Sequence, residues 1–361
     1  MQHGSMMRLE NGNIVDANGI VTFVSIAAFE SDVCSSNICF ICTKALNSKN
    51  QNKEHIIPNW ILKRFDLHNE TVNLPNGSKY KYNQYVIPCC IECNSLLSTE
   101  LETPLSKAFS RGFDGLVNYV EKEGYLNVYL WMALLFIKTH VKDQSLRMCL
   151  DRRVEYSSIA QGVGYKWESF HHVYCLSRVP YTQTTLEQNC VGSFFIVPVE
   201  SIDAKKEFDY MDVSYANTSG VIIGGIGIIT VFGDAGAVCN EIQPTVINKL
   251  SGSVTNMQFR ELVAHFACCS LHLKNNPKHS TISGSSGAQP PRMICTLLNS
   301  KPEFENYNDL VFGSLMDMLL GDLLDGKVAV PEFREKLKAG QLSILFDSSG
   351  KVITPNKSIN R

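Results

Sequence analysis

The stretch "CFICTKALNSKNQNKEHIIPNW", residues 39–60, joins two features that decide how this part of the chain folds. It begins with a C-x-x-C pair and ends with Glu54 and His55 in front of two isoleucines and a proline. A second stretch, "YVIPCCIECNSLLSTELE" at residues 85–102, holds another C-x-x-C pair with an asparagine directly after it. Each C-x-x-C turn directs both sulfurs toward one point, and two such pairs supply the four thiolates that zinc prefers. The sequence therefore predicts a structural Zn²⁺ site formed by Cys39, Cys42, Cys90 and Cys93.

Alternatives to this ligand set remain open. Cys89 competes with Cys90 for one position, Cys34 is a spare thiol, and all of these residues could be ordinary buried cysteines. A zinc site of this kind contributes about 10 to 16 kcal/mol to folding in small metal-bound peptides. If zinc binds, it holds together a region that has little apolar core of its own.

The composition indicates a globular protein. The chain has 361 residues, of which 44% are hydrophobic and 19% charged, so we expect two domains. Its thirteen cysteines are an odd number, spread over a long chain without a secretory signal, which argues against a disulfide framework. The longest apolar runs, residues 19–29 and 125–137, are too short to span a membrane. We therefore expect a cytoplasmic protein with no membrane partner and with reduced or metal-bound thiols.

The character of the sequence changes near residue 115. Residues 125–141 form a long apolar segment with too few breakers for a strand, and they predict a buried helix that opens a second domain. Beyond it, residues 190–200 and 220–233 predict strands, and residues 257–273 and 309–324 predict helices. We expect an α+β protein in three parts: a cloning remnant and N-terminal extension at 1–33, a zinc-stapled domain at 34–115, and a larger mixed α+β domain at 116–361.

The order of the motifs resembles the HNH endonuclease family, whose zinc-stapled members carry C-x-x-C, then Asp/Glu-His-x-x-Pro, then C-x-x-C-Asn. The resemblance covers about residues 34–105, and all of these parts occur in order. It implies a zinc-stapled ββα-metal nuclease domain that hydrolyses phosphodiester bonds of DNA.

The resemblance also implies roles for single residues. His55 would be the general base that activates the attacking water, while Glu54 and Asn94 would hold a catalytic Mg²⁺ or Mn²⁺. The chain departs from the family at the asparagine that gives HNH its middle letter, because that position is occupied by Tyr85, two residues after Asn83. Either Asn83 orients His55 through a shifted turn, or the backbone orients His55 without it.

The chemistry of hydrolysis suits these residue types. An imidazole titrates near neutral pH, as a general base must, and oxygen ligands suit magnesium or manganese whereas four thiolates suit zinc. Beyond Asn94 the sequence reads as a helix, on which Glu102 returns to nearly the same face. Glu102 either joins the catalytic metal or is a solvated helix residue.

The charge of the chain predicts weak intrinsic affinity for DNA. The formal net charge is −2, and residues 39–111 are only mildly basic. We assign DNA contacts to Lys53, Lys63, Arg64 and Lys81, for which a merely solvated surface is the alternative. A nuclease of this charge would need activation through residues 116–361, by a protein partner, a small-molecule ligand or homo-oligomerisation.

Two functional hypotheses follow. The first is a regulated DNA endonuclease of bacterial anti-phage defence or of a mobile element. The second is a zinc-stapled module that binds nucleic acid or protein and has a catalytically silent site. The joint presence of Glu54, His55 and Asn94 favours the first, since binding alone needs none of them.

Other motifs have simpler explanations. His265, Cys268, Cys269 and His272 are spaced as a second metal site could be, but packed core is the preferred interpretation. Trp60 is expected to anchor the core rather than to stack on a base. The pair His171 and His172 shows no partner in the sequence.

Overall fold

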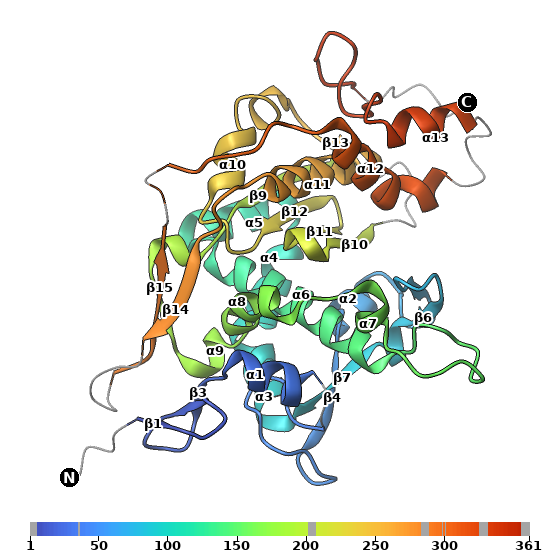
Figure 1. Ribbon diagram of the computed structural model, residues 1–361. Helices are drawn as coiled ribbons and strands as arrows, with labels where there is room; N and C mark the ends of the chain where they lie inside the picture. The colour runs from blue at the N-terminus through green and yellow to red at the C-terminus, as the bar shows by residue number, and fades with distance from the viewer. Residues whose placement is uncertain are drawn as a thin grey trace. The chain divides into compact units, whose positions relative to one another are not determined.

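The computed structural model describes residues 6–34, 37–200, 207–282, 289–297, 299, 301–324 and 331–354. They form a protein of mixed helices and strands, in agreement with the expected α+β class (Figure 1). None of the described helices is long and apolar enough to cross a membrane. The predicted cloning remnant at residues 1–5 lies outside the described residues.

The chain divides into two compact units. The first comprises the described residues of Met1–Arg111, Asn118–Cys190 and His279–Cys295, and the second comprises those of Gly112–Val117, Val191–Lys278 and Thr296–Arg361. This division differs from the boundary expected near residue 115, because the buried helix that follows this boundary packs with the first unit. The assignment of a sensing or docking role to residues 116–361 stays a prediction.

The first unit begins with small sheets and short helices. A three-stranded sheet is followed by a short helix and a π-turn, and then by two two-stranded antiparallel sheets. The elements in chain order are β1 Met7–Arg8, β2 Ile14–Val15, β3 Val21–Phe23, α1 Ile26–Ala28, η1 Phe29–Val33, β4 Gln51–His55, α2 Asn59–Arg64, β5 Thr71–Asn73, β6 Lys79–Lys81, η2 Tyr82–Gln84 and β7 Val86–Cys90.

Helices make up most of the remainder of the first unit. A third sheet has the strand order β14-β15-β8. The elements are α3 Ile91–Leu97, η3 Ser98–Glu102, α4 Thr103–Phe109, α5 Gly112–Glu123 (whose first half belongs to the second unit), α6 Leu126–Ser145, α7 Ile159–Val163, α8 Trp167–Ser177, α9 Val179–Thr182, β8 Thr185–Leu186, η4 Gln188–Cys190, β14 Lys278–Ile282 and β15 Arg292–Thr296.

Helix α6 is the core of the first unit. Its middle turns, from Val128 to Ile137, are buried on every side, which explains the unbroken apolar run in the sequence. It packs against α8, and also against β7 and η3. Trp60 lies beside Phe109 and Trp131, with ring centroids 5.6 and 6.4 Å away, so it is part of this core as expected.

The second unit is built on a five-stranded sheet with the order β10-β11-β12-β9-β13. The two central strands meet in a hairpin at Gly224 and Gly225, whose positive φ angles of 54° and 84° suit a two-residue turn. The elements are β9 Phe194–Glu200, β10 Phe208–Val213, η5 Ser214–Ala216, β11 Thr218–Ile223, β12 Ile226–Val231, α10 Ala237–Ile242, η6 Ile247–Lys249, β13 Val254–Thr255, α11 Asn256–Leu271, α12 Asp309–Leu324 and α13 Pro331–Lys338.

Helix α11 covers this sheet (Figure 1), and ten of its sixteen residues are buried. Gly227 admits it, because a Cβ there would lie 2.4 Å from the ring of Phe259. The helix starts in a capping box between Thr255 and Gln258. The helices predicted at 125–141, 257–273 and 309–324 are thus confirmed as α6, α11 and α12, and the predicted strand at 220–233 is a hairpin of two strands.

Candidate metal centre and active site

The four predicted cysteines form one buried group. Cys39 and Cys42 lie in a tight turn in which Cys39 N–H donates to Lys44 O and Thr43 N–H donates to Cys39 O, each at 2.9 Å. Cys90 ends β7 and caps α3, and Cys93 lies in the first turn of that helix. The four sulfurs all lie within 4.8 Å of one another, so the predicted grouping is confirmed.

The donor set suits zinc. With Zn–S bonds of about 2.3 Å, neighbouring sulfurs of a tetrahedral site lie about 3.8 Å apart. The Sγ atoms of Cys42 and Cys90 are separated by 3.7 Å. In addition, Cys93 N–H donates to Cys90 Sγ at 3.4 Å, a contact that stabilises a thiolate. A metal such as zinc can therefore be held by these side chains.

A fifth thiol lies beside the group. Cys89 Sγ is 3.8 Å from Cys39 Sγ. The hydrogen bond with Cys39 and burial both raise the pKa of Cys89, which favours its protonated form. Cys34 is buried elsewhere in the unit, and burial likewise raises its pKa. Neither belongs to the group of four.

Sequence reasoning missed an arginine that supports the cysteine turn. Arg178, between α8 and α9, is 1% exposed. It donates to Ile41 O at 2.6 Å, inside the turn, and to Val21 O at 2.5 Å, and it lies 5.5 Å from the ring centre of Tyr174. A divalent ion bound by four thiolates has a net charge of −2, so a buried cation nearby is favourable. Its carbonyl partners are distant in sequence, and no local signal could have revealed them.

Glu54 and His55 are the last two residues of β4, where His55 pairs with Val86 of β7. Glu54 is buried, whereas His55 is half-buried and its imidazole makes no hydrogen bond with any described residue. Burial lowers the pKa of His55. At neutral pH the ring is therefore neutral, with a nitrogen able to accept a proton.

A lysine inside the apolar run of α6 binds this pair of residues. Lys138 is completely buried, and its Nζ donates to Glu54 Oε1 and to the main-chain oxygen of His55, both at 2.8 Å. It also lies 4.0 Å from Glu102 Oε1. The two carboxylates thus share one ammonium, and the sequence analysis had assigned no role to this lysine.

Glu102 is not the solvated residue that was the simpler expectation. Its side chain is 15% exposed, and its Oε1 is buried without a hydrogen-bond partner. Desolvation raises the pKa of Glu102 to about 7. The π-turn η3 adds one residue to the helix between Asn94 and Glu102. In an unbroken α-helix the directions of these two side chains would differ by about 80° around the helix axis, and one extra residue reduces the difference to about 20°.

Asn94 and Asn83 occupy different settings. Asn94 lies on α3, which packs against β4, and its amide makes no hydrogen bond with the described residues. Asn83 is exposed on η2, and its side chain also has no hydrogen-bond partner in the described part of the chain. Its main-chain N–H donates to His68 O at 3.4 Å. His68 itself contacts Asn59 Oδ1 at 2.9 Å and is a further histidine near His55 that the sequence analysis missed.

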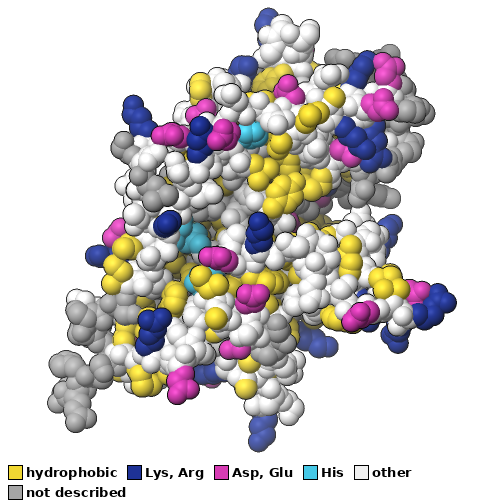
Figure 2. Space-filling model, viewed as in Figure 1, with side chains coloured by type: hydrophobic (Ala, Val, Ile, Leu, Met, Phe, Trp, Pro, Cys, Tyr) yellow, Lys and Arg dark blue, Asp and Glu magenta, His cyan; other side chains and the backbone are white. Residues whose placement is uncertain are grey.

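The proposed DNA contacts are exposed. Lys53, Lys63 and Lys81 are exposed and make no ion pair with the described residues. Arg64 is exposed as well, but it donates to Phe109 O at 2.9 Å. On the face seen in Figure 2, Lys and Arg side chains are interspersed with Asp and Glu, without a patch of one sign.

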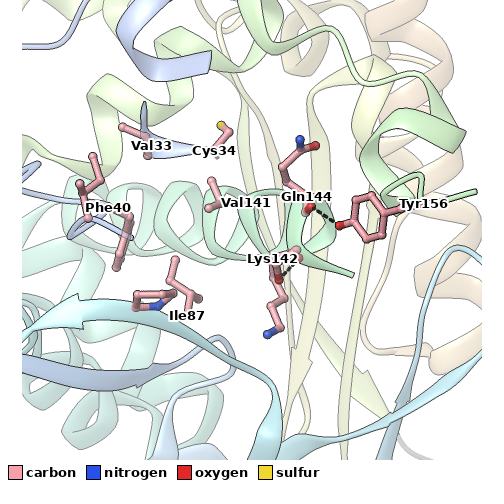
Figure 3. Close-up of a pocket in the computed structure, with 11 residues that line it drawn as sticks. Val33, Cys34, Phe40, Ile87, Val141, Lys142, Gln144 and Tyr156 are labelled. Atoms are coloured by element: carbon pink, nitrogen blue, oxygen red, sulfur yellow. Dashed lines mark hydrogen bonds between the residues drawn. The ribbon is translucent and has the colours of Figure 1, made fainter. Parts of the chain in front are cut away.

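A hollow of about 350 Å³ lies in the same unit. Val141, Lys142 and Gln144 of α6 line it, together with Tyr156, Ile87 and residues that precede β4 (Figure 3). The ammonium of Lys142 lies 5.6 Å from the ring centre of Tyr80, and burial lowers the pKa of this lysine. The walls are mostly apolar, so the hollow lacks the convergent acidic or thiolate ligands of a metal site.

The other clusters behave as core. Cys268 and Cys269 are buried, and His272 Nδ1 contacts Cys268 O at 2.6 Å. Among the described residues, the four-cysteine group is the one set of three or more metal-ligating side chains that come together. His171 and His172 do have partners, because their Nε2 atoms contact Val24 O and Cys190 O, and His172 stacks on His279 at 3.5 Å.

Comparisons with family models, with curated proteins and with solved structures find no match for this chain. What the geometry defines is a mixed α and β protein with a buried four-cysteine group that could bind a metal such as zinc.

Proposed function

We propose that the protein is a metal-dependent endonuclease of the HNH type that hydrolyses phosphodiester bonds of DNA. The observation that carries the proposal is the strand pair β4–β7 followed directly by α3, which brings a neutral His55 and the buried Glu54 together beside a four-cysteine group. Asn94 on α3 completes the set of residues that the resemblance implies.

In this proposal the chain's own residues bind, orient and accept protons. His55 accepts the proton of the attacking water at a ring nitrogen, since neither nitrogen is hydrogen-bonded to a described residue. Glu54 retains Oε2, which has no hydrogen-bond partner among the described residues, and Asn94 retains its amide oxygen. Together they would hold Mg²⁺ or Mn²⁺, which when bound neutralises charge on the phosphate and the leaving oxygen.

The mixed surface charge supports weak binding of DNA by the protein alone. We therefore propose that a protein partner, a small molecule or self-association activates it, as in a defence or mobile-element effector.

One observation favours the alternative, a zinc-stapled binding module with a silent site. Glu54 Oε1 is already bound to an ammonium group, so part of its charge is neutralised without a divalent ion.

Plasmid cleavage tests the proposal. Full-length protein is incubated with supercoiled plasmid and Mg²⁺ or Mn²⁺, beside His55→Ala and a matched control, His272→Ala, in the second unit. We expect His55→Ala to lose about 10² to 10⁴ in rate at unchanged zinc content, and His272→Ala to retain the wild-type rate. Equal cleavage by wild type and His55→Ala would exclude this mechanism.

A further inference from the structure

The position that differs from the family pattern leaves open what orients His55. Tyr85, at the middle position, is buried, and its main-chain oxygen accepts a hydrogen bond from Ile56 N–H at 3.0 Å. Asn83 is exposed, and its amide makes no hydrogen bond with the described residues. Among the described residues, the side chain of Asn83 therefore does not hold the main chain of His55.

Lys138 does hold it. The ammonium group donates to the main-chain oxygen of His55 and to Glu54 Oε1, each at 2.8 Å. It reaches them from α6, so the end of β4 is tied to the buried core helix of the unit. We propose that Lys138 is the positioning residue of this site and fulfils from α6 the orienting role that the middle asparagine has in the family.

The choice of lysine fits these contacts. An ammonium offers three donors around one point, whereas a guanidinium is a flat fork suited to a single planar partner. Two of the three donors are used by Glu54 and His55, and Glu102 Oε1 lies 4.0 Å away. Glu102 thus lies close to the third donor of an ammonium group that has no contact with solvent.

Complete burial gives the proposal a specific kinetic signature. A side chain with 0% exposure cannot contact DNA, so its loss should leave KM for DNA unchanged. Misplacement of a general base by about 1 Å can lower kcat about 10²-fold. Loss of a purely structural lysine would also lower the melting temperature, but it would not reduce kcat per folded molecule.

The test compares two lysines of one helix. Lys138→Met and the control Lys142→Met, one turn later, remove the same charge, but Lys142 makes no ion pair with the described residues. Cleavage is measured per folded, zinc-loaded molecule. We expect kcat to fall about 10²-fold in Lys138→Met with KM unchanged, and Lys142→Met to keep the wild-type values. Wild-type kcat in a folded Lys138→Met protein would overturn the proposal, as would a large loss of kcat in Asn83→Ala alone.

A second variant at the same position is used if Lys138→Met does not fold. If Lys138→Met loses zinc, Lys138→Ala is assayed with added n-propylammonium, which can refill the space. Recovery of kcat that saturates with the amine supports positioning, whereas recovery of the melting temperature without kcat overturns it. The inference rests on the proposed function, but the two fail differently: inactive wild type or active His55→Ala refutes the nuclease, whatever Lys138 does.

Discussion

Each compact unit buries a glutamate on or beside its central helix, and the two are stabilised in different ways. Glu261 of α11 is completely buried in the second unit. Its carboxylate accepts hydrogen bonds from Ser343 Oγ at 2.5 Å, Ile344 N–H at 2.5 Å and Leu345 N–H at 2.8 Å. These donors belong to the last described segment of the chain, which Glu261 thereby fixes to the helix.

Glu54 in the first unit has no such set of donors. It shares Lys138 with Glu102, whose Oε1 has no hydrogen-bond partner, and its neighbour His55 has a free imidazole among the described residues. A buried carboxylate with all its acceptors used has a structural task, whereas unused buried acceptors beside a neutral histidine indicate a site that binds something further.

The largest expected effect concerns the metal. Cys42→Ser should release zinc and unfold the first unit, since zinc sites of this type contribute on the order of 10 kcal/mol. Metal analysis and urea unfolding of the full chain measure this. Cys268→Ser is the control, because this buried cysteine of the second unit is not in the four-cysteine group. If the two variants lost equal unfolding free energy, the effect of Cys42→Ser would not be due to the metal.

The shared ammonium should have the next largest effect. Lys138→Met leaves two buried carboxylates without a counter-charge, which should cost about 3 to 5 kcal/mol of unfolding free energy. Adding Glu54→Gln should restore part of this, because one of the two charges is removed. Thermal or urea unfolding of the two single variants and the double variant gives the coupling energy. Additive losses would show that the pair does not interact.

Glu261→Gln should be less severe. The amide keeps the shape but places an N–H₂ group where the carboxylate accepted three hydrogen bonds, and we expect a loss of about 1 to 3 kcal/mol. Unfolding of the second unit is the measurement, with the exposed Glu241→Gln as control. Because Glu261 acts only on structure here, zinc content should not change. A loss of zinc would contradict the distinction between the two glutamates.

The smallest effect is a pH dependence of the first unit. Burial lowers the pKa of His279 to about 4, and burial also places the pKa of His172, stacked on it, well below its usual range. As the pH falls, these two histidines are therefore protonated in the unfolded chain before they are protonated in the folded protein. The contribution of His279 to stability should be complete above about pH 6.5 and decrease toward pH 4, with a loss of about 1.4 kcal/mol at pH 5.5. Glu102 acts in the opposite direction, because burial raises its pKa to about 7. The difference in unfolding free energy between wild type and His279→Gln, measured with urea between pH 5.5 and 7.5, isolates the histidine, and it should decrease as the pH falls.

The sequence predicted features that are set locally. The two C-x-x-C turns, the apolar run of α6 and the β-branched runs of the sheet strands each have a local signal, and the structure agrees with them. Lys138 had no such signal, because a lysine within "LLFIKTHV" interrupts an apolar pattern and its hydrogen-bond partners Glu54 and His55 are more than eighty residues away. Glu102 ends a π-turn, for which the sequence offers no pattern. Partners that are distant in the chain were therefore missed, while motifs were found.

The interleaved path of the first unit has a consequence for protein synthesis. The cysteines lie within the first hundred residues, but Lys138, Arg178 and the strand that contains His279 are translated later. At about 5 to 20 residues per second, the ribosome reaches Lys138 roughly 2 to 9 s after Cys93, and His279 roughly 10 to 40 s after it. All four cysteines are therefore made before Lys138, the partner of Glu54 and His55. Under the proposed function, a nascent chain would be able to collect its zinc before its nuclease site is in place.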